Sequence, residues 1–208
     1  MTQVLIGLNA VVFVLTSLQA GTGGGVGSLR SRLVLFGPAV ADGDWYRLVT
    51  SGFVHFGLIH IAFNMVLLYR FGSVLEGTLG RIRYLGLYLG SLLVGSCGVL
   101  LLDPRVFTGG ASGAVFGVVG AAALALRREG TGVWESGIGG LLAVNLVLTF
   151  VIPGISVGGH LGGLAGGLLL GSGMLRSSPS RRSTIEGTLL TVVVSWLAIA
   201  LSGWAAPR

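Results

Sequence analysis

The sequence predicts an all-α polytopic membrane protein, a bundle of seven transmembrane helices that forms a single domain over residues 1–208. Hydrophobic residues make up 52% of the 208 residues and charged residues 10%, whereas a soluble domain carries about a quarter charged residues. The mean hydropathy of +0.90 agrees with this class. The charges also cluster, and the uncharged stretches between them are close to or longer than the roughly 20 residues that a helix needs to cross a bilayer.

Six uncharged stretches account for the expected spans. The longest, residues 136–175, is interrupted near its middle by Pro153-Gly154, a pair that breaks helices, so it holds two spans. The expected spans cover about residues 4–20, 52–70, 84–102, 112–127, 135–152, 159–175 and 187–205. The intervals between them leave no room for a water-soluble domain.

The charge and cysteine content excludes several functions. A pI near 10.7 would suggest nucleic acid binding in a soluble protein, but all 13 basic residues are arginines scattered through short loops. We therefore expect no nucleic acid partner and interpret the arginines as topology signals. Cys97 is the one cysteine, so neither a disulfide within the chain nor a cysteine metal cluster can form.

The arginines also predict the orientation in the membrane. Loops on one side carry eight of them and those on the other side five, three of which lie in the long first loop. The eight are Arg70, Arg81, Arg83, Arg127, Arg128, Arg176, Arg181 and Arg182. Because arginine-rich loops tend to stay in the cytoplasm, the N-terminus is expected to be cytoplasmic. Short loops suit a bacterial inner membrane.

The first loop contains the amphipathic stretch Asp42–Arg47, with Trp45 beside Tyr46. Aromatic rings next to an arginine suit the headgroup region, so we expect this loop to lie on the membrane surface. An ordinary connector with interfacial aromatic residues is the alternative interpretation.

Small residues recur at helical spacing in two of the spans. Both ridges repeat every four residues: Gly109, Gly113, Gly117, Ala121 and Ala125 in the fourth span, and Gly159, Gly163, Gly167 and Gly171 in the sixth. Such ridges let helix backbones approach closely. We therefore predict that the fourth and sixth spans are in contact.

The polar residues gather around these ridges. Ser112 precedes Gly113 on one ridge and His160 follows Gly159 on the other, so contact between the ridges makes them neighbours. His55, His60 and Asn64 lie in the second span, and chain parity places them on the same side of the membrane. Each residue alone has a structural interpretation: a serine bonded to its own helix, a packed histidine, an interhelical asparagine. Their conjunction favours a functional site.

This set of residues suits acyl transfer. A hydroxyl becomes a nucleophile when a neighbouring imidazole takes its proton, and Ser112 and His160 supply that pair. No carboxylate lies within the bundle, which indicates a Ser/His dyad. The Gly109–Gly113 segment can present backbone N–H groups to an oxyanion, and His60 and Asn64 can add donors.

A zinc enzyme and a small-solute transporter are two other classes that such polar residues could indicate. Three histidines could bind zinc, but there is no H-E-x-x-H run and no intramembrane carboxylate, so no metal or other cofactor is expected. A small-solute transporter would also use glycine-rich spans and buried polar groups. The halves show no internal repeat, however, and the polar groups gather near one face.

Four short motifs follow one another along the chain. They are Trp45-Tyr46-Arg47, His55 to Asn64 as H-x-x-x-x-H-x-x-x-N, Gly110-Ala111-Ser112-Gly113 as G-x-S-G, and His160 followed by Gly163 and Gly167. In this order and on these spans they resemble the rhomboid family of intramembrane serine proteases, over nearly the whole chain. The resemblance implies a rhomboid-like helical bundle with a six-helix core and one further C-terminal helix.

The resemblance also implies roles for individual residues. Ser112 would be the nucleophile and His160 the general base, while His60, Asn64 and the Ser112 backbone would form the oxyanion hole and His55 would organise the site. The loop from Pro153 to Gly158 would act as a cap and the fifth span as a gate. Phe116 departs from relatives that place a tyrosine there to stack on the histidine; the ring is kept and the hydroxyl lost.

The expected function is therefore an intramembrane serine endopeptidase that cleaves single-span transmembrane proteins near their extracytoplasmic end. Its partners would be these substrates and the lipid bilayer. The alternatives are a catalytically inactive rhomboid-like binding protein and a small-solute transporter.

Overall fold

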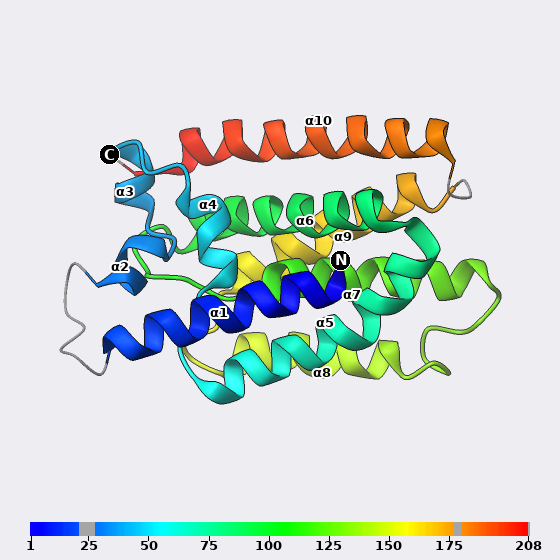
Figure 1. The fold of residues 1–208 in the computed structure, drawn as a ribbon, viewed down its shortest axis with the longest axis horizontal. Coiled ribbons are helices and arrows are strands. Elements are labelled where there is room, and N and C mark those ends of the chain that lie inside the picture. Colours follow the sequence, from blue (N-terminus) through cyan, green and yellow to red (C-terminus); the bar gives the residue numbers. More distant parts are fainter. Residues whose placement is uncertain (21–27, 177–179, 208) are drawn as a thin grey trace.

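The computed structural model describes residues 1–20, 28–176 and 180–207, and all regular secondary structure in these ranges is helical apart from one isolated β-bridge between Leu35 and Thr108. Seven helices of 14 or more residues lie side by side in the described part (Figure 1). They are α1 (Thr2–Ala20), α5 (Leu58–Leu79), α6 (Arg81–Leu102), α7 (Ser112–Arg128), α8 (Ile138–Val151), α9 (Val157–Met174) and α10 (Arg181–Ala205). By length and composition, α1, α5, α6 and α10 can each cross a membrane, and α8 is a shorter apolar helix. The predicted all-α membrane bundle is confirmed.

The first loop folds into short helices that pack on one end of the bundle (Figure 1). These are α2 (Leu29–Leu33), α3 (Gly37–Ala41), α4 (Arg47–Thr50) and the 3-10 helix η1 (Ser51–Phe53). Val40 and Leu48 join a buried cluster with Leu93 of α6 and Ala198 of α10. The loop is therefore not an ordinary connector, because its apolar side chains are part of the core.

The second long helix begins later than the expected span 52–70, at Leu58. Gly57 is fully extended, with φ −173° and ψ 164°, and Val54 ends η1 in an extended conformation. His55 therefore precedes the helix rather than lying in its N-terminal half, which corrects the expectation. Its side chain is fully buried, and its Nε2 accepts a bond from the Ala111 N–H at 3.4 Å.

Helix α9 lies between α6 and α7, at the centre of the bundle. The predicted contact between the glycine ridges is confirmed: a Cβ at Gly163 would lie 2.7 Å from the Gly113 Cα, and one at Gly171 would lie 2.9 Å from the Ala121 Cβ. Gly109 lies outside this contact because α7 begins only at Ser112.

A second close contact, with α6, escaped the sequence analysis. A Cβ at Gly95 would lie 2.9 Å from the Gly159 carbonyl oxygen, and one at Gly162 would lie 2.6 Å from the Val94 carbonyl oxygen. Gly98 and Gly158 also meet backbone to backbone. Helix α9 thus packs closely against the backbones of α6 and α7 through glycines on two of its sides. This packing fixes the position of its first turn relative to α7.

The two outer helices differ in how they are held. Helix α10 packs along α6, while α8 lies on the opposite side of the bundle, in contact with α7 and α9 (Figure 1). Only Ile138, Gly139 and Thr149 are buried among the residues of α8. Helix α8 therefore has few fully buried residues, although Leu141 and Leu142 also pack against the core.

Candidate active site

Ser112 is the first residue of α7 and is half-buried. In the described part of the chain its hydroxyl makes no hydrogen bond, whereas Thr16 and Ser202 each donate to the carbonyl four residues earlier. The difference follows from position: a residue in the first turn has no helical carbonyl behind it. The Ser112 hydroxyl is therefore available to react.

Within the described part of the chain, the backbone around Ser112 leaves the first N–H groups of α7 free, including that of Ser112. The Gly110 N–H donates to the Ser51 carbonyl oxygen at 2.9 Å and the Ala111 N–H to His55 Nε2. No acceptor for the Ser112 N–H occurs among the described residues, and no side chain caps the helix. An uncapped helix start with an unused N–H is a site for an anionic oxygen.

The first loop holds the segment that leads to Ser112. Leu35 and Thr108 exchange backbone bonds of 2.8 and 3.0 Å, and the Gly37 N–H donates to the Pro104 carbonyl oxygen at 2.7 Å. Together with the Ser51 bond, these contacts fix the chain from residue 104 to residue 110. The packed first loop thus fixes the position at which α7 begins.

Arg47 and Trp45 support this loop and lie apart from the reactive groups. Arg47 Nη1 donates to the carbonyl oxygens of Ser31 and Val34 at 2.8 and 2.9 Å, and its Nε pairs with Asp44 at 2.9 Å. The Trp45 ring packs against α10, where a Cβ at Gly203 would lie 2.6 Å from it. Arg47 therefore joins parts of the first loop to one another, and Trp45 joins this loop to α10.

His60 and Ser112 face a common space at Gly110. A Cβ at Gly110 would lie 2.8 Å from His60 Nε2 and 3.6 Å from the Ser112 Oγ. The φ of Gly110 is +139°, which L side chains rarely adopt. Glycine here satisfies both the backbone and the space between the two functional groups.

The other second-span residues surround His60. The rings of His55 and His60 meet edge to face, with centroids 4.9 Å apart, and Phe56 stacks on the other side at 6.4 Å. Asn64 is buried and its Nδ2 donates to the His60 carbonyl oxygen at 2.8 Å. This bond lies within α5, so it is not the interhelical bond considered as an alternative. An amide nitrogen has two hydrogens, and the second remains for another acceptor.

His160 lies in the first turn of α9, which Ser156 caps by accepting the Gly159 N–H at 3.0 Å. Its ring stacks on Phe116, one turn beyond Ser112, with centroids 4.3 Å apart and planes at 23°. The described residues contain no hydrogen bond between the Ser112 hydroxyl and the His160 ring. Such bonds often tighten only when substrate binds.

Thr149 is a site residue that the sequence analysis missed. Its Oγ1 lies 2.6 Å from His160 Nδ1 and donates to the Asn145 carbonyl oxygen at 2.7 Å. Asn145 and Thr149 are the only polar side chains in α8, four residues apart on one face. That spacing in an otherwise apolar span was the available signal.

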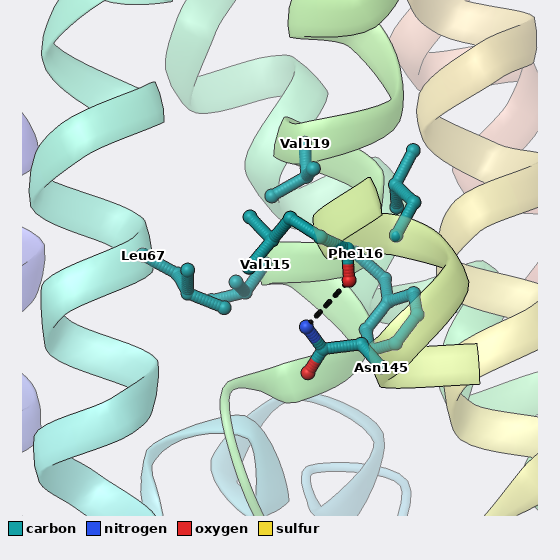
Figure 2. Close-up of a pocket in the computed structure, with 7 residues that line it drawn as sticks. Leu67, Val115, Phe116, Val119 and Asn145 are labelled. Atoms are coloured by element: carbon teal, nitrogen blue, oxygen red, sulfur yellow. Dashed lines mark hydrogen bonds between the residues drawn. The ribbon is translucent and has the colours of Figure 1, made fainter. Parts of the chain in front are cut away.

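A small cavity opens beside this group, between α5, α7 and α8 (Figure 2). It is lined by Leu67, Val115, Phe116, Val119, Leu141, Leu142 and Asn145. Only Asn145 is polar, and its Nδ2 donates to the Leu141 carbonyl oxygen at 2.8 Å, the bond dashed in Figure 2. The ring that supports His160 thus borders an apolar space on its other side.

No cluster of three potential metal-binding side chains occurs among residues 1–20, 28–176 and 180–207. The groups gathered at this end of the bundle are a hydroxyl, imidazoles, an amide and backbone N–H groups.

The fold and these groups define a multi-pass helical membrane protein with a polar site at one end of its bundle. The Rhomboid domain family matches residues 42–177. The chain belongs to the rhomboid family, as its motifs had indicated. Membership makes it an enzyme of the serine-type endopeptidase class, an intramembrane hydrolase.

Relatives agree with this assignment. The rhomboid relative YdcA of Bacillus subtilis is 35% identical over 170 residues, which cover 80% of this chain and 84% of YdcA. The rhomboid protease GluP of the same organism is 33% identical over 173 residues, 80% of this chain but only 33% of GluP. RHOMBOID-like protein 5 of Arabidopsis thaliana is 32% identical over 154 residues, which are 70% of this chain and 47% of that protein. The chain therefore spans most of YdcA and less than half of the other two.

Proposed function

We propose that the protein cleaves single-span transmembrane proteins within the membrane by a dyad in which Ser112 is the nucleophile and His160 the general base. The observation that carries the proposal is the start of α7. There Ser112 offers an unbonded hydroxyl and an unused N–H, one turn before the ring on which His160 stacks. A structural serine would satisfy its hydroxyl within its own helix.

The chemistry proceeds in two acyl-transfer steps. The Ser112 Oγ gives its proton to His160 Nε2 and bonds to the scissile carbonyl carbon. As the tetrahedral intermediate collapses, the carbon–nitrogen bond breaks and His160 returns the proton to the leaving amine. Water, deprotonated by His160, then attacks the Ser112 ester and releases the new carboxyl end. Every proton is supplied and recovered by the dyad.

The charge that develops on the carbonyl oxygen needs preorganised donors. The His60 ring and the Ser112 side chain face the space at Gly110, and we assign the unused Ser112 N–H and the second Asn64 N–H as further donors. His55 contributes indirectly: it accepts the Ala111 N–H and packs against the His60 ring. It therefore holds the donors without touching the substrate.

The substrate must expose a backbone carbonyl to Ser112. A transmembrane helix satisfies its amides internally, so the scissile bond becomes accessible only where the helix unwinds. We expect efficient substrates to carry small or helix-breaking residues at the cut. The eight arginines that the sequence assigns to loops at the far end of the bundle support our proposal that this site faces the extracytoplasmic side, with a cytoplasmic N-terminus in a bacterial inner membrane.

The test is cleavage of a single-span reporter by detergent-purified protein. Wild type, Ser112→Ala and His160→Ala are compared, with Ser172→Ala as the matched control, because Ser172 lies on α9 and bonds the Leu169 carbonyl. Labelling with a fluorophosphonate probe reports on the nucleophile without any reporter. The thermal midpoint of each variant shows whether it is folded.

We expect wild type and Ser172→Ala to cut and to take up the probe, and the other two variants to be folded and inactive. Cleavage that survives in Ser112→Ala would refute the dyad. A folded wild type that neither cuts nor reacts with the probe would instead support a catalytically inactive rhomboid-like protein.

A further inference from the structure

Thr149 places a buried hydroxyl beside Nδ1 of the His160 ring. The residue is 2% exposed, and its Oγ1 lies 2.6 Å from His160 Nδ1. It comes from α8, whereas His160 belongs to α9 and the stacked Phe116 to α7. Three helices thus hold one imidazole. Helix α9 carries the residue, Phe116 of α7 stacks on the face of the ring, and Thr149 of α8 contacts Nδ1.

The hydrogen bonds of Thr149 determine which nitrogen of His160 carries the proton. A threonine hydroxyl has one hydrogen, and the Asn145 carbonyl oxygen at 2.7 Å can only accept it. Once this hydrogen is used, the oxygen can only accept a bond from the ring. His160 Nδ1 must then carry its proton, and the other nitrogen, Nε2, keeps a free lone pair.

We propose that Thr149 is a positioning residue that holds His160 in the tautomer with a free Nε2. The inference rests on the proposed function, in which Nε2 is the atom that takes the proton from Ser112. The opposite tautomer would present an N–H to the serine and could not act as a base. In serine proteases of the triad type a carboxylate fixes this tautomer, and loss of the correct tautomer costs about 10⁴-fold in kcat.

A neutral orienting group fits this site better than a carboxylate. No aspartate or glutamate lies in α8 or α9, and an unpaired charge within the bilayer is costly. The Thr149 oxygen also accepts from Nδ1 when the ring becomes an imidazolium, because the Nδ1 proton stays in place throughout the cycle. Thr149 and the Asn145 carbonyl thus perform, without a charge, the orienting role of the missing acid.

The test separates the hydroxyl from the methyl group of Thr149. Thr149→Val keeps the shape and removes the hydroxyl, while Thr149→Ser keeps the hydroxyl and removes the methyl. Thr16→Val is the matched control: Thr16 is 1% exposed and bonds the carbonyl four residues earlier, but it lies on α1. Initial rates against reporter concentration give kcat and KM for each folded variant.

We expect Thr149→Val to lower kcat about 10²-fold with KM changed less than twofold, because general-base catalysis contributes about 10²–10⁴-fold. Thr149→Ser should restore at least a third of the wild-type kcat, and Thr16→Val should leave it unchanged. Equal losses in Thr149→Ser and Thr149→Val would overturn the proposal, since a packing role predicts that result. So would a wild-type kcat in Thr149→Val.

A second measurement does not depend on proteolysis. The chain has three histidines, so ¹⁵N NMR of histidine-labelled protein gives three imidazole pairs, and His160→Gln assigns one of them. We expect the protonated-Nδ1 pattern for His160 in wild type and in Ser112→Ala, and an altered pattern in Thr149→Val. A protonated Nε2 in wild type would refute the tautomer. Cleavage by Ser112→Ala would refute the proposed function and leave this readout standing.

Discussion

Gly163 lies three residues after His160, at a close approach between the backbones of α9 and α7. A Cβ there would fall 2.5 Å from the Gly113 carbonyl carbon and 2.7 Å from its Cα, and ordinary van der Waals contact starts near 3.4 Å. Both neighbours are backbone atoms, so no side chain can turn aside. Gly163→Ala must therefore move the two helices apart by roughly 1 Å.

This separation should affect stability and catalysis together. Overpacking of a close contact costs about 1–3 kcal/mol, which for a chain of this size lowers the thermal midpoint by about 2–12 °C. Gly113 follows Ser112 directly, so the nucleophile moves with it. A displacement of about 1 Å can cost about 10²-fold in rate. We expect kcat to fall by at least tenfold at a temperature where the variant remains folded.

Reporter cleavage and thermal unfolding in detergent measure the two effects. Gly77→Ala is the matched control, because Gly77 also lies within a helix and a Cβ there meets no atom within 4 Å. The control should keep wild-type kcat and stability. An unchanged midpoint and an unchanged kcat in Gly163→Ala would refute the close packing of α7 and α9.

Three further substitutions test other parts of the site. Gly110→Ala puts a Cβ 2.8 Å from His60 Nε2 in a backbone with φ +139°, so kcat should fall; an unchanged kcat would contradict an oxyanion role for this space. Phe116→Ala removes the ring stacked on His160 and should lower kcat by up to about tenfold, whereas Phe116→Tyr should stay near wild type; a silent Phe116→Ala would show that stacking is dispensable. Arg47→Gln deprives two carbonyls of a charged donor and should cost about 1.5–3 kcal/mol in thermal unfolding, with kcat retained at low temperature; an unchanged midpoint would count against its role in the first loop.

Features with a fixed period were predictable from the sequence. The ridge from Gly113 to Ala121 and the ridge from Gly159 to Gly171 repeat every helical turn, so their contact follows from helix geometry alone. The same reasoning brought Ser112 and His160 to one end of the bundle. The four glycines of α6 repeat irregularly, at residues 86, 90, 95 and 98, and the contact of the last three with α9 was missed for that reason.

Features set by tertiary contacts were not predictable. His55 precedes α5 because the backbone at Gly57 is extended and the Ala111 N–H holds the ring, and neither fact is visible in an uncharged stretch. The folding of the first loop depends on Arg47 reaching carbonyls 13 and 16 residues earlier in the chain. Long-range pairing of this kind has no local periodicity.

Thr149 joins the polar site to a helix that has few fully buried residues. Helix α8 is buried only at Ile138 and Gly139 near its start and at Thr149 near its end. The hydroxyl at that second contact is the one that bonds His160 Nδ1. Movement of this end of α8 away from α9 must break the bond, because a hydrogen bond does not extend beyond about 3.5 Å. On the proposal that Thr149 positions His160, the orientation of this imidazole depends on the docking of α8, and the tautomer with a free Nε2 is held only while that helix is in place.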